Sequence, residues 1–153
     1  MRVEIVDGTL TRELRRQVLR PALSIEDPLP GDELTEVTHF AALEPGPKIL
    51  KTMDEVVSAC FITPERCPWR SAGGKDWQLR QMATAAQHQG QGAGAAVLQA
   101  VLEHLATDRP GILWCYARES AVPLYERAGL AKFGEVFTDA DHVIAHQRMW
   151  RAI

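Results

Sequence analysis

Residues 77–106 read WQLRQMATAAQHQGQGAGAAVLQAVLEHLA and predict a strand, a glycine-rich turn and a long helix, in that order. Trp77, Leu79 and Met82 lie in a short segment of mixed apolar and polar residues, which is typical of a half-buried strand. Glycine tolerates positive φ and lets a backbone approach a ligand closely, and the turn contains Gly90, Gly92 and Gly94. Apolar residues then recur at i, i+3 and i+4, the spacing of an inward-facing helical stripe: Val97, Leu98, Val101, Leu102 and Leu105. A helix that begins at such a turn presents unpaired N–H groups and a positive dipole end, so we expect the turn to hold a diphosphate.

The composition is that of one soluble domain. The chain has 153 residues, of which 46% are hydrophobic and 24% charged, and we expect residues 1–153 to form a single domain. A net charge of -3 and a pI near 5.9 argue against a nucleic-acid partner, and no apolar run is long enough to span a bilayer. The N-terminus lacks a secretory pattern, and the three cysteines show no metal-binding spacing. We therefore expect a cytoplasmic protein without a metal site.

The remaining segments predict further strands and two more helices. We expect a helix around residues 10–18 that ends before Pro21, and another over residues 121–128 that Ser120 caps and Gly129 ends. Residues 22–32 suggest an exposed loop or a loosely helical lid. The charge run Arg12, Arg15, Arg16 and Arg20 is expected on the solvated face of the first helix. Strands are expected at residues 2–6, 38–43, 56–63, 112–117, 133–137 and 142–150.

This order, β α β β β α β α β β, predicts an α/β (mixed α+β) architecture with helices on the faces of a mixed sheet. Only the central strand-helix-strand unit must be parallel and right-handed.

The glycine turn by itself admits three interpretations. It lacks the Gly-Lys-Ser/Thr ending of a P-loop, which argues against a nucleoside triphosphatase of that class. It fits a dinucleotide fingerprint from Gly90 through Gly92 to Ala95, with Glu119 as the ribose-binding acid, although that fold needs repeated strand-helix units. It is also compatible with a tight turn whose glycines pack a helix against a strand. Phosphate capture explains best why three glycines open a helix.

Two strings of the sequence together resemble a known family. The segment from Leu79 to Leu98 resembles motif A of the GNAT acetyltransferases, Gln/Arg-x-x-Gly-x-Gly/Ala, with Gln89, Gly92 and Gly94 at its defining positions. The string AVPLYERAGL, residues 121–130, is similar to motif B of the same family. Two motifs in the right order and separation are much more specific than either one. The resemblance implies a GNAT-like, mostly antiparallel mixed sheet flanked by about four helices, in the order β-α-(α)-β-β-β-α-β-α-β-β.

The resemblance also implies a cosubstrate and its binding residues. Acetyl-CoA would lie with its diphosphate on the glycine turn and its pantetheine arm along the preceding strand. The sheet would splay beside that strand and leave a slot for the thioester. The residues so implied are Met82, Ala83 and Thr84 of the strand and Gln89, Gly90, Gln91, Gly92, Ala93, Gly94 and Ala95 of the turn. Relatives often carry Phe where this chain has Leu130, and Asn where it has Tyr116 to Arg118.

Acetyl transfer to an amine needs a base for the amine and an acid for the departing thiolate. The resemblance implies Tyr125 as the general acid; without it, a core aromatic residue is the better interpretation of Tyr125. The predicted strand 78–84 has no carboxylate to serve as base, and His39, Glu119, His142 and His146 are candidates. His146 is favoured among them because IAHQRM resembles a family ending in which a His approaches the acceptor pocket. Cys115 on a predicted buried strand is more typical of a small apolar residue than of a nucleophile, which favours direct transfer in a ternary complex.

We therefore expect an N-acetyltransferase that acts on a primary amine of a small molecule or peptide. A non-catalytic acyl-CoA-binding or sensor domain and a small dinucleotide-binding module are the alternatives. The acidic residues Glu26, Asp27, Asp32 and Glu33 hint at a cationic acceptor, although a solvated loop explains them equally well. By resemblance a homodimer through the terminal strands is expected.

Overall fold

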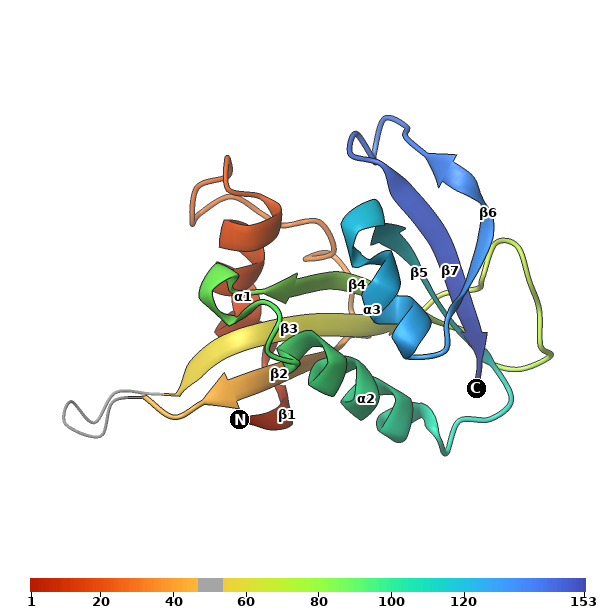
Figure 1. The fold of residues 1–153 in the computed structure, drawn as a ribbon, viewed down its shortest axis with the longest axis horizontal. Coiled ribbons are helices and arrows are strands. Elements are labelled where there is room, and N and C mark those ends of the chain that lie inside the picture. The colour runs from red at the N-terminus through yellow and green to blue at the C-terminus, as the bar shows by residue number, and fades with distance from the viewer. Residues whose placement is uncertain (47–53) are drawn as a thin grey trace.

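The described part of the computed structural model comprises residues 1–46 and 54–153, which form one seven-stranded sheet with helices on both faces. The strands lie side by side in the order β1-β2-β3-β4-β5-β7-β6 (Figure 1). Only β4 and β5 are parallel, and every other neighbouring pair is antiparallel. The strands are β1 (Arg2–Val6), β2 (Thr38–Glu44), β3 (Glu55–Pro64), β4 (Trp77–Thr84), β5 (Ile112–Arg118), β6 (Ala131–Phe137) and β7 (His146–Ala152).

The helices divide between the two faces of this sheet (Figure 1). The main core joins α2 (Ala93–Leu105) and α3 (Val122–Arg127) to one face, and Val97, Leu98 and Val101 of α2 are fully buried there. On the opposite face α1 (Gly8–Leu19) packs Leu14 against Ala59 and Ala83 of the central strands. Two short 3₁₀ turns, η1 (Ala86–His88) and η2 (Glu119–Ala121), follow β4 and β5. The expected fold class and strand-helix order are therefore confirmed.

Three details differ from the sequence prediction. Among the described residues there are three α-helices instead of about four, because Pro21, Pro28 and Pro30 break the segment after α1 into turns. Ser120 does not cap α3: it lies within η2, and the N-cap position belongs to Ala121. A proline in the first turn of α3 already removes one of the N–H groups that a cap would satisfy.

The third difference is the position of Arg15. Three of the four arginines expected on the solvated face of α1 are at least partly exposed, but Arg15 is only 4% exposed. The apolar stripe of α1 is short, and Arg15 lies beside Leu14 on the side of the helix that faces the sheet.

The sheet opens between its two parallel strands. The register of β4 and β5 consists of Trp77 opposite Leu113 and Gln78 opposite Trp114, at the start of each strand. Beyond this point the strands diverge, and their arrows in Figure 1 point in different directions. The splay of the sheet beside β4, which the family resemblance implies, is thus present in the structure. In the part of the chain that is described, no helix has the length and apolar character needed to cross a membrane.

Candidate functional site

The glycine turn between β4 and α2 has the geometry of an open helix N-terminus. Gly90 and Gly92 have φ values of 75° and 85°, and Gly92 is the N-cap of α2. A Cβ placed on either glycine would meet nothing within 4 Å, so the backbone conformation, and not crowding, requires glycine there. No side chain caps this helix end. The first N–H groups of α2 therefore remain available to an anion.

Gly94 contributes to the site in a different way. It lies in the first turn of α2, where an added Cβ would be 3.4 Å from Leu124 Cδ2 of α3 and 3.4 Å from Thr84 Oγ1 of β4. The absence of a side chain lets α2 approach the end of β4 closely. Gln89 ties the turn to the same strand, since its Nε2 donates to the Thr84 carbonyl at 3.5 Å. The residues predicted to hold the diphosphate therefore adjoin the end of the strand predicted to hold the pantetheine arm.

The edge of β4 that faces β5 is open over the residues predicted to bind the arm. On its other side β4 pairs with β3, where Ala83 lies opposite Ala59 and Thr84 opposite Ser58. Ser58 Oγ donates to the Ala83 carbonyl at 3.1 Å and lies 2.9 Å from Thr84 Oγ1. The register with β5 ends at Gln78, so the β5-facing groups of residues 82–84 are free of strand pairing. An extended ligand can add to such an edge as a strand does.

A β-bulge lies in the middle of this open edge. The step from Ala59 to Phe61 on β3 is matched by the longer step from Arg80 to Ala83 on β4, so β4 carries one extra residue. Gln81 within it has φ of 54°, the one non-glycine residue with positive φ in the described chain. Strained backbone of this kind persists where the surroundings fix it, and it is common at functional sites.

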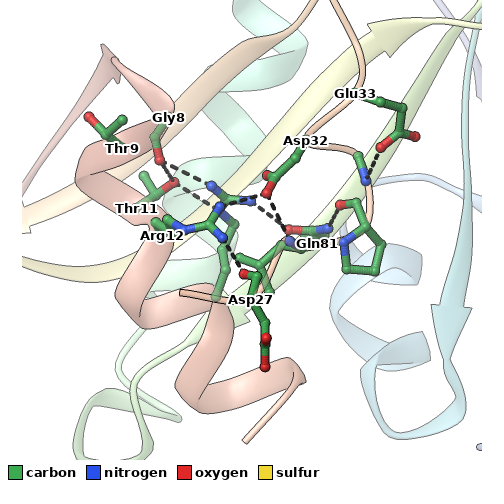
Figure 2. Close-up of polar contacts among 12 residues, drawn as sticks. Gly8, Thr9, Thr11, Arg12, Asp27, Asp32, Glu33 and Gln81 are labelled. Carbon is green, nitrogen blue, oxygen red and sulfur yellow. Dashed lines mark hydrogen bonds and ion pairs between the residues drawn. The ribbon is translucent and has the colours of Figure 1, made fainter. Parts of the chain in front are cut away.

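Arg15 fixes this bulge from the α1 side. Its Nη1 donates to Gln81 Oε1 at 2.8 Å, its Nε to Thr11 Oγ1 at 3.0 Å and its Nη2 to the Gly8 carbonyl at 3.0 Å. The Gln81 amide in turn donates to the Pro30 carbonyl. Figure 2 shows Gln81 facing Gly8 and Thr11 of α1 within this network. Sequence reasoning missed this residue, because a charge run on a helix gives no sign that one of its members is buried.

The predicted acid, Tyr125, lies in the core on the α2/α3 face and is 3% exposed. Burial raises the pKa of its hydroxyl well above the ordinary value, and the nearby Cys115 and Cys60 raise it further. The phenol is therefore protonated at neutral pH, as a proton donor must be.

The predicted base, His146, lies on the opposite face of the sheet. It begins β7 opposite Arg118 of β5, while Met149 of β7 and Cys115 of β5 face the core that contains Tyr125. Its Nδ1 lies 2.6 Å from the Ile144 carbonyl, and burial lowers the pKa of the imidazole below its ordinary value of 6.5. The ring is therefore neutral at pH 7 and its Nε2 can accept a proton. The structure thus places the two predicted catalytic side chains on opposite faces of the sheet.

The cysteines show no sign of activation. Cys115 is 1% exposed and Cys60 fully buried, and burial raises the pKa of both thiols. A thiol of raised pKa in an apolar core is a poor nucleophile. The structure therefore agrees with the interpretation of Cys115 as a packing residue.

A model of the acetyltransferase (GNAT) domain matches residues 69–151, which is more than half of the 153-residue chain. The chain belongs to the GNAT acetyltransferase family. No curated protein matches the sequence. The matched range begins before β4 and includes both strings on which the resemblance was based.

Several solved structures share the GNAT fold of this chain. An aminoglycoside 6'-N-acetyltransferase complexed with coenzyme A has a TM-score of 0.68 at 15% identity, with 99% of this chain and 97% of that chain covered. ElaA from Escherichia coli has a TM-score of 0.70 at 15% identity, with 99% of both chains covered. The aminoglycoside 6'-N-acetyltransferase from Enterococcus faecium has a TM-score of 0.68 at 14% identity, with 99% of this chain and 97% of that chain covered. At these identities the likeness shows the fold, and it extends over nearly the whole GNAT chain.

Proposed function

We propose that this GNAT chain is an acetyl-CoA-dependent N-acetyltransferase that transfers the acetyl group directly to a primary amine of a small molecule or peptide. Family membership supports acyl transfer as the reaction class. One similar structure contains coenzyme A, which supports a CoA-type cosubstrate. The observation that carries the proposal is the unpaired edge of β4, which leads from the splayed slot to the open N-terminus of α2.

In this proposal the chain's backbone binds most of acetyl-CoA. The groups of Met82, Ala83 and Thr84 that face β5 pair with the pantetheine arm, and the N–H groups of residues 89–95 hold the diphosphate. A backbone N–H of the same strand segment, next to the bulge at Gln81, stabilises the oxyanion that forms at the thioester carbonyl. No side chain with a net charge is needed for these contacts.

The proton transfers are assigned to two side chains. An alkyl amine has an ordinary pKa near ~10.4, so the acceptor must lose a proton to become a nucleophile. His146, neutral at pH 7, takes this proton directly or through water. As the C–S bond breaks, the nitrogen loses its second proton to solvent, and Tyr125 donates its hydroxyl proton to the departing thiolate.

Two measurements test the proposal. Calorimetric titration with acetyl-CoA and CoA at low salt should show binding, and a thiol-release assay over a panel of primary amines should show turnover with at least one of them. Absence of CoA binding by the folded protein would overturn the proposal. Binding without turnover on any amine would favour the non-catalytic acyl-CoA sensor, an alternative that the lack of a carboxylate on β4 keeps open.

We also propose that residues 1–153 form one acetyltransferase domain and that two copies associate through the terminal strands. β6 is an edge strand, and it exposes Phe133 (42%) and Val136 (44%). Exposed apolar side chains on an unprotected edge favour pairing with another strand. Light scattering after size exclusion should give the mass of a dimer, and Val136→Lys should shift it toward the 17.0 kDa monomer. A wild-type protein that is monomeric at high micromolar concentration would contradict this.

A further inference from the structure

Two guanidinium groups from distant parts of the chain converge on one oxygen atom beside the slot. Arg20, at the C-cap of α1, donates its Nη1 to the Leu19 carbonyl at 3.0 Å. Arg118, the last residue of β5, donates its Nη2 to the same carbonyl at 3.3 Å. A carbonyl at a helix C-terminus attracts a cation, and one guanidinium suffices for this. The second adds charge repulsion that the carbonyl alone does not offset.

No acidic side chain neutralises this pair. Within residues 1–46 and 54–153, neither Arg20 nor Arg118 has a carboxylate within 4.0 Å, whereas Arg12 pairs with Asp32 at 2.7 Å and Arg16 with Glu13 at 2.6 Å. Arg118 is half-buried, and its pKa is lowered by burial and then by the charge of Arg20. Each side chain uses one N–H for the shared carbonyl, so most of its donors are left over.

Two histidines lie beside the arginine pair. His146 lies directly opposite Arg118 across the β5–β7 ladder, and the rings of His142 and His146 are 4.7 Å apart. The Asp139 carboxylate is 2.9 Å from His142 Nδ1 and also accepts backbone N–H groups. The result is a cluster of basic groups at the end of β5, on the face of the sheet that carries α1 and His146.

Three of the four acidic residues that hinted at a cationic acceptor, Asp27, Asp32 and Glu33, have hydrogen-bond partners in their own loop or in α1. The Asp27 carboxylate accepts the N–H of Ser24 at 2.8 Å, Asp32 is paired with Arg12, and Glu33 accepts the N–H of Gly31 at 3.2 Å. Figure 2 shows Asp32 and the backbone carbonyl of Asp27 in contact with Arg12 of α1, and Glu33 in contact with the loop itself. The Asp32 and Asp27 contacts hold the loop against α1. Among the described residues neither Arg20 nor Arg118 has a carboxylate partner, so the side of the slot that adjoins the proposed base carries two unpaired positive charges.

We propose that Arg20 and Arg118 bind a carboxylate of the acceptor, so that the substrate class is an amine that also bears a carboxylate, such as an amino acid or a small peptide. The inference rests on the proposed function and deepens it. Guanidinium groups bind carboxylates through paired, charge-assisted hydrogen bonds, and two of them enclose such a group better than one. His146 adjoins the pair, which places the amine of the bound acceptor within the range of the base.

The experiment compares matched acceptors and matched variants. Amino acids and ω-amino carboxylates of increasing length are assayed against the corresponding amides, with thiol release from acetyl-CoA as the readout. In the wild type we expect the carboxylate member of at least one pair to have a kcat/KM about ten- to a hundred-fold higher than its amide. Arg118→Gln and Arg20→Gln should lower the kcat/KM of the carboxylate acceptor toward that of its amide and leave the kcat/KM of the amide unchanged. Arg127→Gln removes the same charge from an exposed position in α3 and should change neither.

Two controls separate the failures. Arg118→Lys keeps the charge but loses the planar fork and should recover part of the discrimination, provided that its melting temperature matches the wild type. The inference would be overturned, while the proposed function stands, if the wild type had equal kcat/KM for the amide and the carboxylate in every pair. It would also be overturned if Arg118→Gln lowered both values equally. A phosphate of the coenzyme is the other anion that the two arginines could bind. In that case Arg118→Gln would weaken the binding of CoA but not of dephospho-CoA, and the preference for carboxylate over amide acceptors would be unchanged. That result would show that the inference is wrong. Failure of the wild type to bind acetyl-CoA at all would overturn the proposed function instead.

Discussion

Tyr125 has its hydroxyl in an apolar core, and this position defines a test of the acid role. The burial that raises its pKa keeps the phenol protonated at neutral pH, while the ring packs with residues that stay in place in Tyr125→Phe. We expect this variant to retain its acetyl-CoA affinity and to lose about a hundred-fold in kcat, because the thiolate then leaves unprotonated. Tyr116→Phe removes the chain's other tyrosine hydroxyl, which faces away from that core, and should keep its kcat. An unchanged kcat in Tyr125→Phe would show that the tyrosine only packs.

The lowered pKa of His146, together with its proposed role as the base, predicts how the reaction depends on pH. Because burial lowers its pKa below 6.5, the imidazole is charged only in more acidic solution and is free to accept a proton above that point. We expect kcat/KM to rise with pH through an apparent pKa below 6.5 and to show no such limb in His146→Gln. If the variant keeps the limb, the base is another group or a water chain.

Arg15 illustrates the limit of sequence reasoning for single residues. The helix around it was predicted, as were the glycines at the head of α2, because local spacing determines both. The burial of Arg15 depends on Gln81, which lies 66 positions away and meets it only after α1 packs on the sheet. The same holds for Arg20 and Arg118, which both donate to the Leu19 carbonyl. Arg118 is 99 positions away from Leu19 in the sequence.

At the scale of elements, the turn before α2 allows a matched pair of substitutions. Gly92 and Gly73 have φ of 85° and 79°, and a Cβ on either would meet nothing within 4 Å. Alanine at either position should therefore cost a similar free energy of unfolding, about 1–2 kcal/mol for a left-handed conformation, measured by urea denaturation. Only Gly92→Ala should also weaken acetyl-CoA binding in calorimetry, since it distorts the N–H groups that hold the diphosphate. Equal acetyl-CoA affinities in the two variants would contradict the assignment of the turn.

The boundaries of the elements were predicted unevenly. Strong periodicity located α2 and β5 well, whereas the last strand begins at His146 and not at His142. Residues 139–142 instead form a turn closed by the Asp139 carboxylate, a local hydrogen-bonding pattern that competes with strand pairing. Ser120 was assigned as a cap on its residue type alone, and the proline that follows made the cap unnecessary.

For the whole molecule, the slot divides the sheet into two parts that meet at the start of β4 and β5. A ligand that pairs with β4 in this slot binds only the folded state and stabilises it. At a hundred-fold excess over Kd we expect about 2.7 kcal/mol, or a rise in Tm of about 5–11 °C for a protein of this size. Thermal shift measures this directly, with NAD as a control that should have no effect. A shift with NAD and none with CoA would favour the dinucleotide-binding alternative.

The order of the strands was beyond the reach of sequence reasoning. The parallel unit follows from the strand-helix-strand pattern, but the insertion of β7 between β5 and β6 depends on pairings between distant segments. That insertion brings His146 next to Arg118 and so assembles the cluster on which the acceptor proposal depends.

The separation of Tyr125 and His146 by the sheet has one more consequence. With a layer of backbone between them, the proton that leaves the amine and the proton that reaches the sulfur travel by separate routes. For an acceptor that arrives as an ammonium ion, the nitrogen loses two protons in each turnover and the sulfur gains one, so the reaction would release two hydrogen ions to solvent and draw one from solvent to restore the phenol. Solvent deuterium should therefore slow the proton transfers at His146 and Tyr125 independently. If either residue cannot return to its starting protonation state, the first turnover should still occur.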